Sequence, residues 1–166
     1  PFYSAIVEGC IERGKECKQW IYPSMVHDMT IVIGSTNIAD SLAAIKKVVF
    51  EDRLLSLPQL IEIMDKNWKD HEDIRQACLN APKYGNDDDY ADDLMKMVFE
   101  VYWNAIDGRP NTKGGHHRVN LLPTTVHIYF GRMIGALPDG RLAKEPLSEG
   151  VSPVQGADIK GPTAVI

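Results

Sequence analysis

The sequence predicts an α/β protein that is mostly helical and contains two short strands. Apolar residues recur at helical spacing over much of the chain. Two runs rich in β-branched and aromatic residues, near residues 29–33 and 124–130, instead indicate strands. The chain of 166 residues, with 44% hydrophobic and 25% charged residues, is long enough to bury a core. We therefore expect a single domain over residues 1–166, with 109–118 as its only plausible internal boundary.

Five helices are expected along the chain. They span residues 2–17, 37–50, 57–68, 70–80 and 86–107. Asn37 is a suitable N-cap for the second helix, and Pro58 favours the start of the third. The apolar stripe expected on the second helix consists of Ile38, Leu42, Ile45 and Val49. The buried face expected on the last consists of Tyr90, Leu94, Met97, Val98, Val101 and Tyr102.

The residues from Gly135 to Ile166, here called the closing segment, are expected to be ordered without regular secondary structure. Pro138-Asp139-Gly140 predicts a turn, because proline presets φ and glycine accepts a positive φ. Further prolines block helix and interior strand. Apolar residues recur throughout the segment, so we expect it to be pinned against a larger body.

Composition excludes several classes of function. A net charge of -5 argues against nucleic-acid binding, which requires a basic surface. No apolar run is long enough to cross a bilayer, and the opening residues lack a signal-peptide pattern, so we expect no membrane partner and a cytoplasmic location. The three cysteines form no C-x-x-C pair and favour reduced thiols.

Four stretches of the sequence carry a family resemblance. The closing segment contains PDGR-x-A-x-x-PL-x-x-G-V-SP-x-x-G-x-D-x-x-GPTA, which is similar to the signature of glycyl radical enzymes, the pyruvate formate-lyase and diol dehydratase superfamily. PFYSAIVEGCIERGK, ADSLAAIKKVVFED and APKYGNDDDYADDL resemble further segments of that family in the same order. Lys144 is a departure, because the family usually has glycine after that alanine.

The resemblance implies a fold and a mechanism. The chain would be an internal, partial slice of the ten-stranded α/β barrel of a longer lyase of anaerobic metabolism. In the family, an activating enzyme with S-adenosylmethionine and an iron–sulfur cluster generates an organic radical on a glycine. That glycyl radical then forms a thiyl radical on a cysteine, which attacks the substrate. The radical-glycine motif Arg-Val-x-Gly-Tyr does not occur in these residues. We therefore expect wall and scaffold here, with no bound cofactor, and a parent that is a homodimer or larger.

Cys10 stands in Gly-Cys-Ile-Glu, which resembles the family's thiyl-radical motif Gly-Cys-Val-Glu. The family places that cysteine on a loop tip, whereas Cys10 has helical spacing to Ile6 and Val7. Its flanking residues match a different family segment. We therefore interpret Cys10 as a structural cysteine.

No metal site is expected from the sequence. The aspartates at 87–89, 92 and 93 lack the glycine and glutamate spacing of an EF-hand, and they suit the first turns of a helix. The adjacent histidines His116 and His117 have no carboxylate or cysteine at ligand spacing, and His127 is expected to be structural within a strand.

The substrate-binding candidates are His27 and Asp28. They stand directly before an apolar strand, where a charged group requires a partner or a shifted pKa; the alternative is a pair that caps a surface loop. Many diol-type relatives have Gly-Gly-Ala-Arg-Tyr-Asn nearby, whereas this chain has the more apolar IYPSMV at 21–26. The stretch thus looks more like arylacetate decarboxylases such as 4-hydroxyphenylacetate decarboxylase, for which a small iron–sulfur subunit is a possible partner.

Two other functions stay open. One is a glycyl radical lyase that cleaves C–O, C–N or C–S bonds in a diol, a choline-like molecule or a sulfonate. The other is a non-catalytic helical binding module that retains the family's core.

Overall fold

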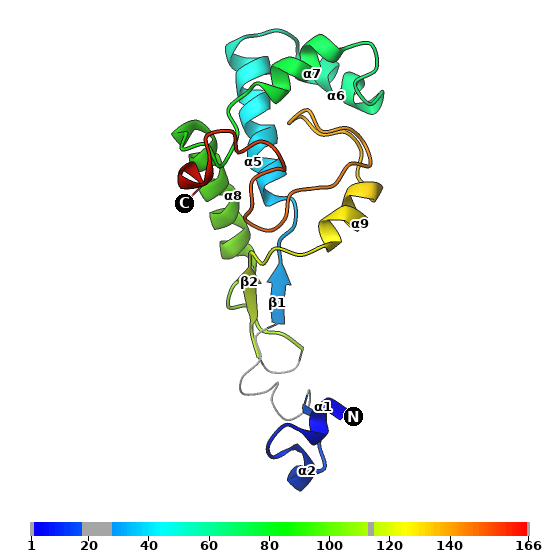
Figure 1. Cartoon of the computed structure of the whole chain (residues 1–166), viewed down its shortest axis with the longest axis vertical. Coiled ribbons are helices and arrows are strands. Elements are labelled where there is room, and N and C mark those ends of the chain that lie inside the picture. The colour runs from blue at the N-terminus through cyan, green and yellow to red at the C-terminus, as the bar shows by residue number, and fades with distance from the viewer. Residues whose placement is uncertain (1, 18–27, 113–114, 166) are drawn as a thin grey trace. The chain divides into compact units, whose positions relative to one another are not determined.

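The computed structural model describes residues 2–17, 28–112 and 115–165, and only the backbone of Asp28 and Met29 (Figure 1). These residues form two compact units. The strand unit comprises residues 1–31 and 102–120, and the helical unit comprises residues 32–101 and 121–166. The boundary considered at 109–118 lies inside the strand unit. The assignment of all 166 residues to one domain stays a prediction.

The strand unit contains two parallel strands. β1 (Asp28–Ile31) pairs with β2 (His117–Asn120), so that Asp28 is opposite His117 and Ile31 is opposite Asn120. The strand expected near 29–33 is thus confirmed with a shift of one or two residues. The long helix expected over 2–17 is wrong as a continuous element. It is divided into α1 (Phe2–Ala5) and α2 (Cys10–Arg13), because Gly9 has a φ of 82° that ends helical geometry.

The strand expected near 124–130 is also wrong. Residues Val126–Met133 form helix α9, and the second strand is the more polar segment His117–Asn120. The run at 126–130 contains β-branched and aromatic residues, but its burial is helical. His127 and Gly131, four residues apart, are the buried positions of α9.

The helical unit is built on α5 (Ser35–Ala44), which continues as the π-helix η1 (Ile45–Glu51) (Figure 1). α6 (Leu57–Asp65), α7 (Glu72–Leu79) and α8 (Asp89–Ile106) follow in order, and α8 ends in the strand unit. α6 begins after Ser56, whose backbone N–H donates to Oε1 of Gln59 at 2.8 Å. None of the described helices is both long and apolar enough to cross a membrane.

A small core joins α5, η1, α6 and α7. Its buried members are Ala44, Val48, Leu60, Ile63, Trp68, Cys78 and Ala81. Outside this core the expected apolar stripes are partly wrong. Ile38 is 49% exposed, and Met97 and Val101 of α8 are exposed, whereas Ala91 and Met95 are buried. The covered residues of α5 are mostly small or polar: Ser35, Thr36, Asn37, Ala39, Asp40, Ser41, Ala43 and Ala44.

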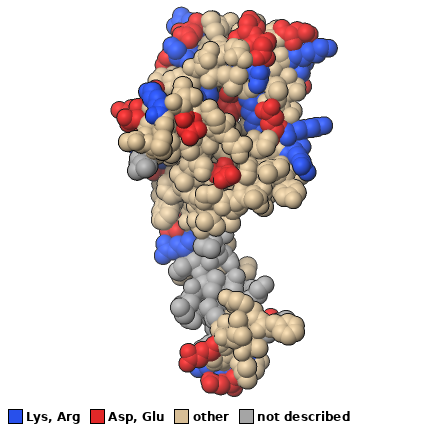
Figure 2. Space-filling model, viewed as in Figure 1, with Lys and Arg blue, Asp and Glu red and all other residues tan. Residues whose placement is uncertain are grey.

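The closing segment follows the prediction. Apart from the short 3-10 helix η2 (Pro162–Ala164), it has no regular secondary structure, and it lies across α5 as the orange-to-red trace in Figure 1. On the face shown in Figure 2, acidic and basic side chains are interspersed over the helical unit.

Candidate functional site

The structure places only part of the predicted substrate-binding pair. His27 lies outside the described residues, and Asp28 is described by its backbone as the first residue of β1. Its register partner is His117, so the two strands bring these positions side by side. The role of His27 and Asp28 in substrate binding stays a prediction.

The most extensive polar site lies between the start of α5 and the closing segment. Ser35 Oγ donates to the carbonyl of Gly150 at 2.6 Å, and Thr36 Oγ1 donates to that of Ser152 at 2.9 Å. Asn37 is buried and uses both ends of its amide. Its Nδ2 donates to Asp139 Oδ2 at 2.6 Å, and its Oδ1 accepts the backbone N–H of Ser148 at 2.6 Å. Asn37 therefore joins two parts of the closing segment to α5 and is not a helix cap.

The predicted turn at Pro138-Asp139-Gly140 is confirmed. The N–H of Gly140 donates to the carbonyl of Leu137 at 3.1 Å, and Gly140 has a φ of 94°. A Cβ at Gly140 would lie 2.6 Å from Cγ of Leu79. Glycine is therefore required at this position by both backbone conformation and space.

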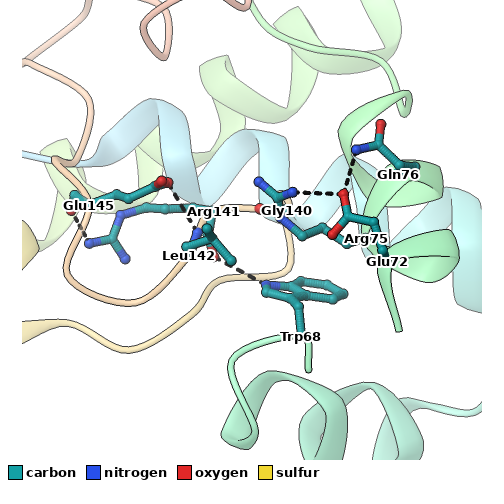
Figure 3. Close-up of polar contacts among 8 residues, drawn as sticks. All are labelled: Trp68, Glu72, Arg75, Gln76, Gly140, Arg141, Leu142 and Glu145. Carbon is teal, nitrogen blue, oxygen red and sulfur yellow. Dashed lines mark hydrogen bonds and ion pairs between the residues drawn. The ribbon is translucent and has the colours of Figure 1, made fainter. Parts of the chain in front are cut away.

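Two side chains of the helical unit hold this turn (Figure 3). Arg75 Nε donates to the carbonyl of Gly140 at 2.9 Å, while its Nη1 pairs with Glu72 Oε1 at 2.9 Å. Trp68 Nε1 donates to the carbonyl of Arg141 at 3.2 Å. The turn is thus fixed to the residues around α6 and α7 through its backbone oxygens.

Arg141 is 5% exposed, and its guanidinium organises the neighbouring loop. It donates to the backbone carbonyls of Gly131, Gly135, Glu145 and Pro146. Burial lowers the pKa of Arg141 and raises that of Asp139, whose Oδ1 accepts the Arg141 N–H at 3.0 Å. This arrangement pairs the carbonyls of Gly135, Glu145 and Pro146, which lie outside regular secondary structure, and ties them to Gly131 in the last turn of α9.

Asp40 is a buried carboxylate at this site with one unpaired oxygen. It is fully buried on α5; its Oδ1 accepts the Tyr84 N–H at 2.8 Å, and its Oδ2 has no hydrogen-bond partner. Burial raises the pKa of Asp40 to about 7. Lys83 Nζ donates to the carbonyl of Cys78 at 2.6 Å, and burial lowers its pKa. A cavity of about 720 Å³ adjoins Asp40 and Lys83.

His127, expected within a strand, instead lies in the first turn of α9. It is buried, with Nδ1 donating to the carbonyl of Thr124 and Nε2 lying 3.6 Å from Glu149 Oε1. This side chain connects α9 to the closing segment. Among the described residues, no group of three or more histidine, cysteine, aspartate or glutamate side chains could hold a metal ion.

A family model described as pyruvate formate lyase-like matches residues 1–131. The chain belongs to the pyruvate formate lyase-like family. A glycyl radical enzyme from Archaeoglobus fulgidus has a similar structure, with a TM-score of 0.83 and 36% identity over 99% of this chain and 21% of that one. The resemblance to glycyl radical enzymes is therefore confirmed, as is the expectation of a mostly helical slice of their barrel.

Two relatives of this pyruvate formate lyase-like chain are named for different reactions, dehydration and decarboxylation. The trans-4-hydroxy-L-proline dehydratase of Clostridioides difficile is 45% identical over all of this chain and 21% of its own length. The structure of this dehydratase with trans-4-hydroxy-L-proline bound superposes with a TM-score of 0.83. The match covers 98% of this chain and 20% of the dehydratase chain. The indoleacetate decarboxylase of Tractidigestivibacter scatoligenes is 32% identical over 80% of this chain and 18% of its own length. The chain spans about a fifth of the length of these relatives.

The departure from the family pattern at Lys144 has a structural consequence. Lys144 has a φ of 71°, in the left-handed region where glycine is favoured. This pyruvate formate lyase-like chain thus keeps the backbone turn that a glycine would suit, with a lysine in its place.

Cys10 is only partly in the setting expected from the sequence. It is 2% exposed, as a structural cysteine should be, and burial raises the pKa of its thiol. However, Ile6 is 80% exposed, and Cys10 directly follows the left-handed Gly9 at the start of α2. The unbroken helix expected around Cys10 is therefore wrong, and its structural role stays a prediction that is supported by its burial.

Proposed function

We propose that this chain forms wall and scaffold in the barrel of a full-length glycyl radical lyase and has no activity by itself. The observation that carries the proposal is the 45% identity to a dehydratase over the whole chain, together with the matching fold. The radical-glycine motif is absent from these 166 residues. In the complete protein, the glycyl radical and the active cysteine would supply hydrogen-atom abstraction from the substrate.

The reaction best supported is elimination of water from a small hydroxylated substrate. The relative with 45% identity is named a trans-4-hydroxy-L-proline dehydratase, whereas the indoleacetate decarboxylase is 32% identical over a smaller part of the chain. The higher identity to the dehydratase favours C–O cleavage, the alternative reading of the sequence, over arylacetate decarboxylation.

Arylacetate decarboxylation is the second candidate. It is supported by the apolar residues 21–26, which would suit a flat aromatic ring better than a polyol. A small iron–sulfur subunit would accompany the complete protein in this case.

The proposed contribution of this chain to catalysis is positioning of the substrate. His27 and Asp28 would line one side of the substrate cavity of the complete barrel. Asp28 is the first residue of β1 and is opposite His117 on β2. A carboxylate or imidazole there would hydrogen-bond a substituent of the substrate and hold it within reach of the thiyl radical. This role involves no proton transfer at the reacting carbon.

The complete protein would also require a radical S-adenosylmethionine activating enzyme, and we propose that it acts in the cytoplasm as a homodimer or larger assembly. The activating enzyme and the assembly are proposed from the family resemblance, and the location from the sequence pattern.

The test is product analysis with the complete protein after anaerobic activation. Trans-4-hydroxy-L-proline, glycerol, indoleacetate and 4-hydroxyphenylacetate are supplied separately, and products are identified by mass spectrometry. We expect loss of water from a hydroxylated substrate. Loss of carbon dioxide from an arylacetate would establish the second candidate, and no turnover in a radical-bearing enzyme would contradict both.

The role of Asp28 is tested by Asp28→Asn, with Asp93→Asn on the exposed face of α8 as a matched control. Asp28→Asn should raise KM or alter substrate preference while the yield of glycyl radical is unchanged. Unchanged kinetics in this variant would remove Asp28 from the substrate site.

A further inference from the structure

Helix α9 carries large apolar side chains on its outer surface. Five of its eight residues are large, apolar and between 37% and 82% exposed. They are Val126, Ile128, Tyr129, Phe130 and Met133. Ile134, which follows the helix, and Leu122, which precedes it, are exposed as well. Single apolar residues are normal on a surface, but a helix that is apolar around most of its circumference is typical of a buried position.

Four of these side chains form one stripe. They recur at the helical spacing i, i+3, i+4 and i+7 and therefore lie along one side of α9. The stripe consists of Val126, Tyr129, Phe130 and Met133. This is the spacing with which an amphipathic helix docks into an apolar groove.

The apolar stripe of α9 contains no charged side chain. Arg132 is the only Asp, Glu, Lys or Arg residue in the helix, and its guanidinium carbon lies 5.8 Å from the centre of the Tyr129 ring. The charge is therefore at the border of the stripe and not within it. An occupant of this surface must present apolar groups, because a polar group would lose its hydrogen bonds to water without gaining a partner.

The helix cannot turn this stripe inward, because its other side is fixed to the closing segment (Figure 1). His127 is 3% exposed, and its carbonyl accepts the N–H of Leu147 at 3.3 Å. The carbonyl of Gly131 accepts from Nη2 of Arg141 at 2.7 Å. A Cβ at Gly131 would clash with the carbonyl oxygen of Glu145, so no larger side chain fits there. The apolar stripe consequently stays on the outer side of α9.

The rest of the complete protein is the occupant that this stripe fits best. The chain spans about a fifth of the length of its relatives, so about four fifths of a comparable protein lies outside these 166 residues. A contact surface without charges is typical of permanent interfaces, whereas transient interfaces are more polar. Another part of the same polypeptide is present in every copy and joins without the loss of translational freedom that a separate molecule incurs.

We propose that the apolar stripe of α9 docks into an apolar groove formed by the part of the complete protein that lies outside these 166 residues. The inference rests on the proposed function in one respect, that the complete protein is longer than this chain. It requires neither the glycyl radical nor a bound substrate. The stripe is then an internal contact of one polypeptide and is closed to solvent in the folded protein.

The test is photo-crosslinking of the complete protein without activation. The photoreactive residue p-benzoylphenylalanine is incorporated at Met133, the most exposed position of the stripe, and at Asp93 on the exposed face of α8 as a control. We expect the product from position 133 to migrate at the mass of a single chain. Peptide mass spectrometry should join this position to a segment outside the 166 residues, with at least fivefold lower yield from position 93.

The other products each have a distinct meaning. A product at twice the mass of the chain would assign the stripe to a second copy. A crosslink to another of the 166 residues would place its contact within this chain, and no crosslink from position 133 would leave the stripe facing solvent. Each of these results would overturn the proposal.

Cysteine labelling provides a second measurement with a smaller substitution, and it decides the question if the photoreactive variant does not fold. In the folded complete protein, Met133→Cys should react with a maleimide at least tenfold more slowly than Asp93→Cys, at a rate that is independent of protein concentration. The two sites should react equally fast in denaturant, with labelling followed by peptide mass spectrometry. Equal rates in the folded protein would overturn the proposal.

The result is independent of the lyase activity, because neither measurement uses an activated enzyme. A complete protein that forms no glycyl radical but gives the expected crosslink would contradict the proposed function and support the docked stripe. A radical-bearing enzyme with a solvent-exposed stripe would do the reverse.

Discussion

Asn37 Nδ2 on α5 donates a hydrogen bond of 2.6 Å to Oδ2 of Asp139 in the closing segment. These two residues are 102 positions apart, and both are buried. The same asparagine accepts the backbone N–H of Ser148. One amide therefore connects two separate parts of the closing segment to the helix that they cover.

Asn37→Ala should destabilise the fold. The substitution removes both hydrogen bonds and leaves a buried carboxylate oxygen of Asp139 without a donor, at a cost of about 2–4 kcal/mol in the free energy of unfolding. Chemical denaturation measures the change. Asn104→Ala, at an exposed position of α8, serves as the control and should change stability by less than about 0.5 kcal/mol. An equal effect of the two substitutions would show that Asn37 does not hold the closing segment.

The closing segment also shows what the sequence could predict. Proline and glycine determine backbone conformation locally, so the turn at Pro138-Asp139-Gly140 and the lack of regular structure follow from residue types alone. The partners of that turn could not be predicted in this way. Arg141 and Asn37 bind backbone groups and side chains that are distant in sequence, and helical periodicity of apolar residues carries no information on them.

Two other elements show why sequence patterns were insufficient. Helix α5 is buried mostly through small and polar residues, because the closing segment covers it with hydrogen-bonding groups; a search for apolar stripes therefore selected Ile38, which is exposed. β-branched and aromatic residues suggested a strand at 124–130, although they also fit the helix α9. For the substrate site, the residue pattern predicts His27 and Asp28, and their role stays a prediction.

Asp40 should make stability depend on pH. Its pKa is about 7 in the folded state and 3.8 as a free side chain, so the folded state binds the proton more tightly. The free energy that protonation of Asp40 contributes to folding is therefore fully present below pH 3.8 and is lost as the pH rises to about 7. The free energies of unfolding of the wild type and Asp40→Asn should diverge over this range. The variant should gain on the order of 2–4 kcal/mol in free energy of unfolding relative to the wild type. Parallel curves for the two proteins would contradict the assignment.

Lys144→Gly should leave the fold intact and stabilise it by up to about 1 kcal/mol, because glycine adopts the positive φ without steric cost. Lys96→Gly in the exposed part of α8 is the opposite control and should destabilise by about 1 kcal/mol or more. Thermal unfolding of both variants gives the comparison. A loss of stability in Lys144→Gly would mean that the lysine side chain supports the turn.

Cys10→Ala should lower stability by about 1–2 kcal/mol, as expected for truncation of a small buried side chain. In the complete protein, this variant should retain its glycyl radical and its turnover, because the thiol is buried and its pKa is raised. Cys17→Ala, at a less buried cysteine, is the control. Abolished turnover in a folded Cys10→Ala enzyme that carries the radical would identify Cys10 as the thiyl cysteine.

Electron paramagnetic resonance can show directly whether the complete protein that contains this chain is a glycyl radical lyase. The complete protein is incubated anaerobically with a radical S-adenosylmethionine activating enzyme, S-adenosylmethionine and a reductant. We expect the doublet signal of a glycyl radical, stable until oxygen is admitted. A complete protein that is folded and correctly paired with its activating enzyme but gives no glycyl signal would contradict the assignment as a lyase and favour a non-catalytic binding module.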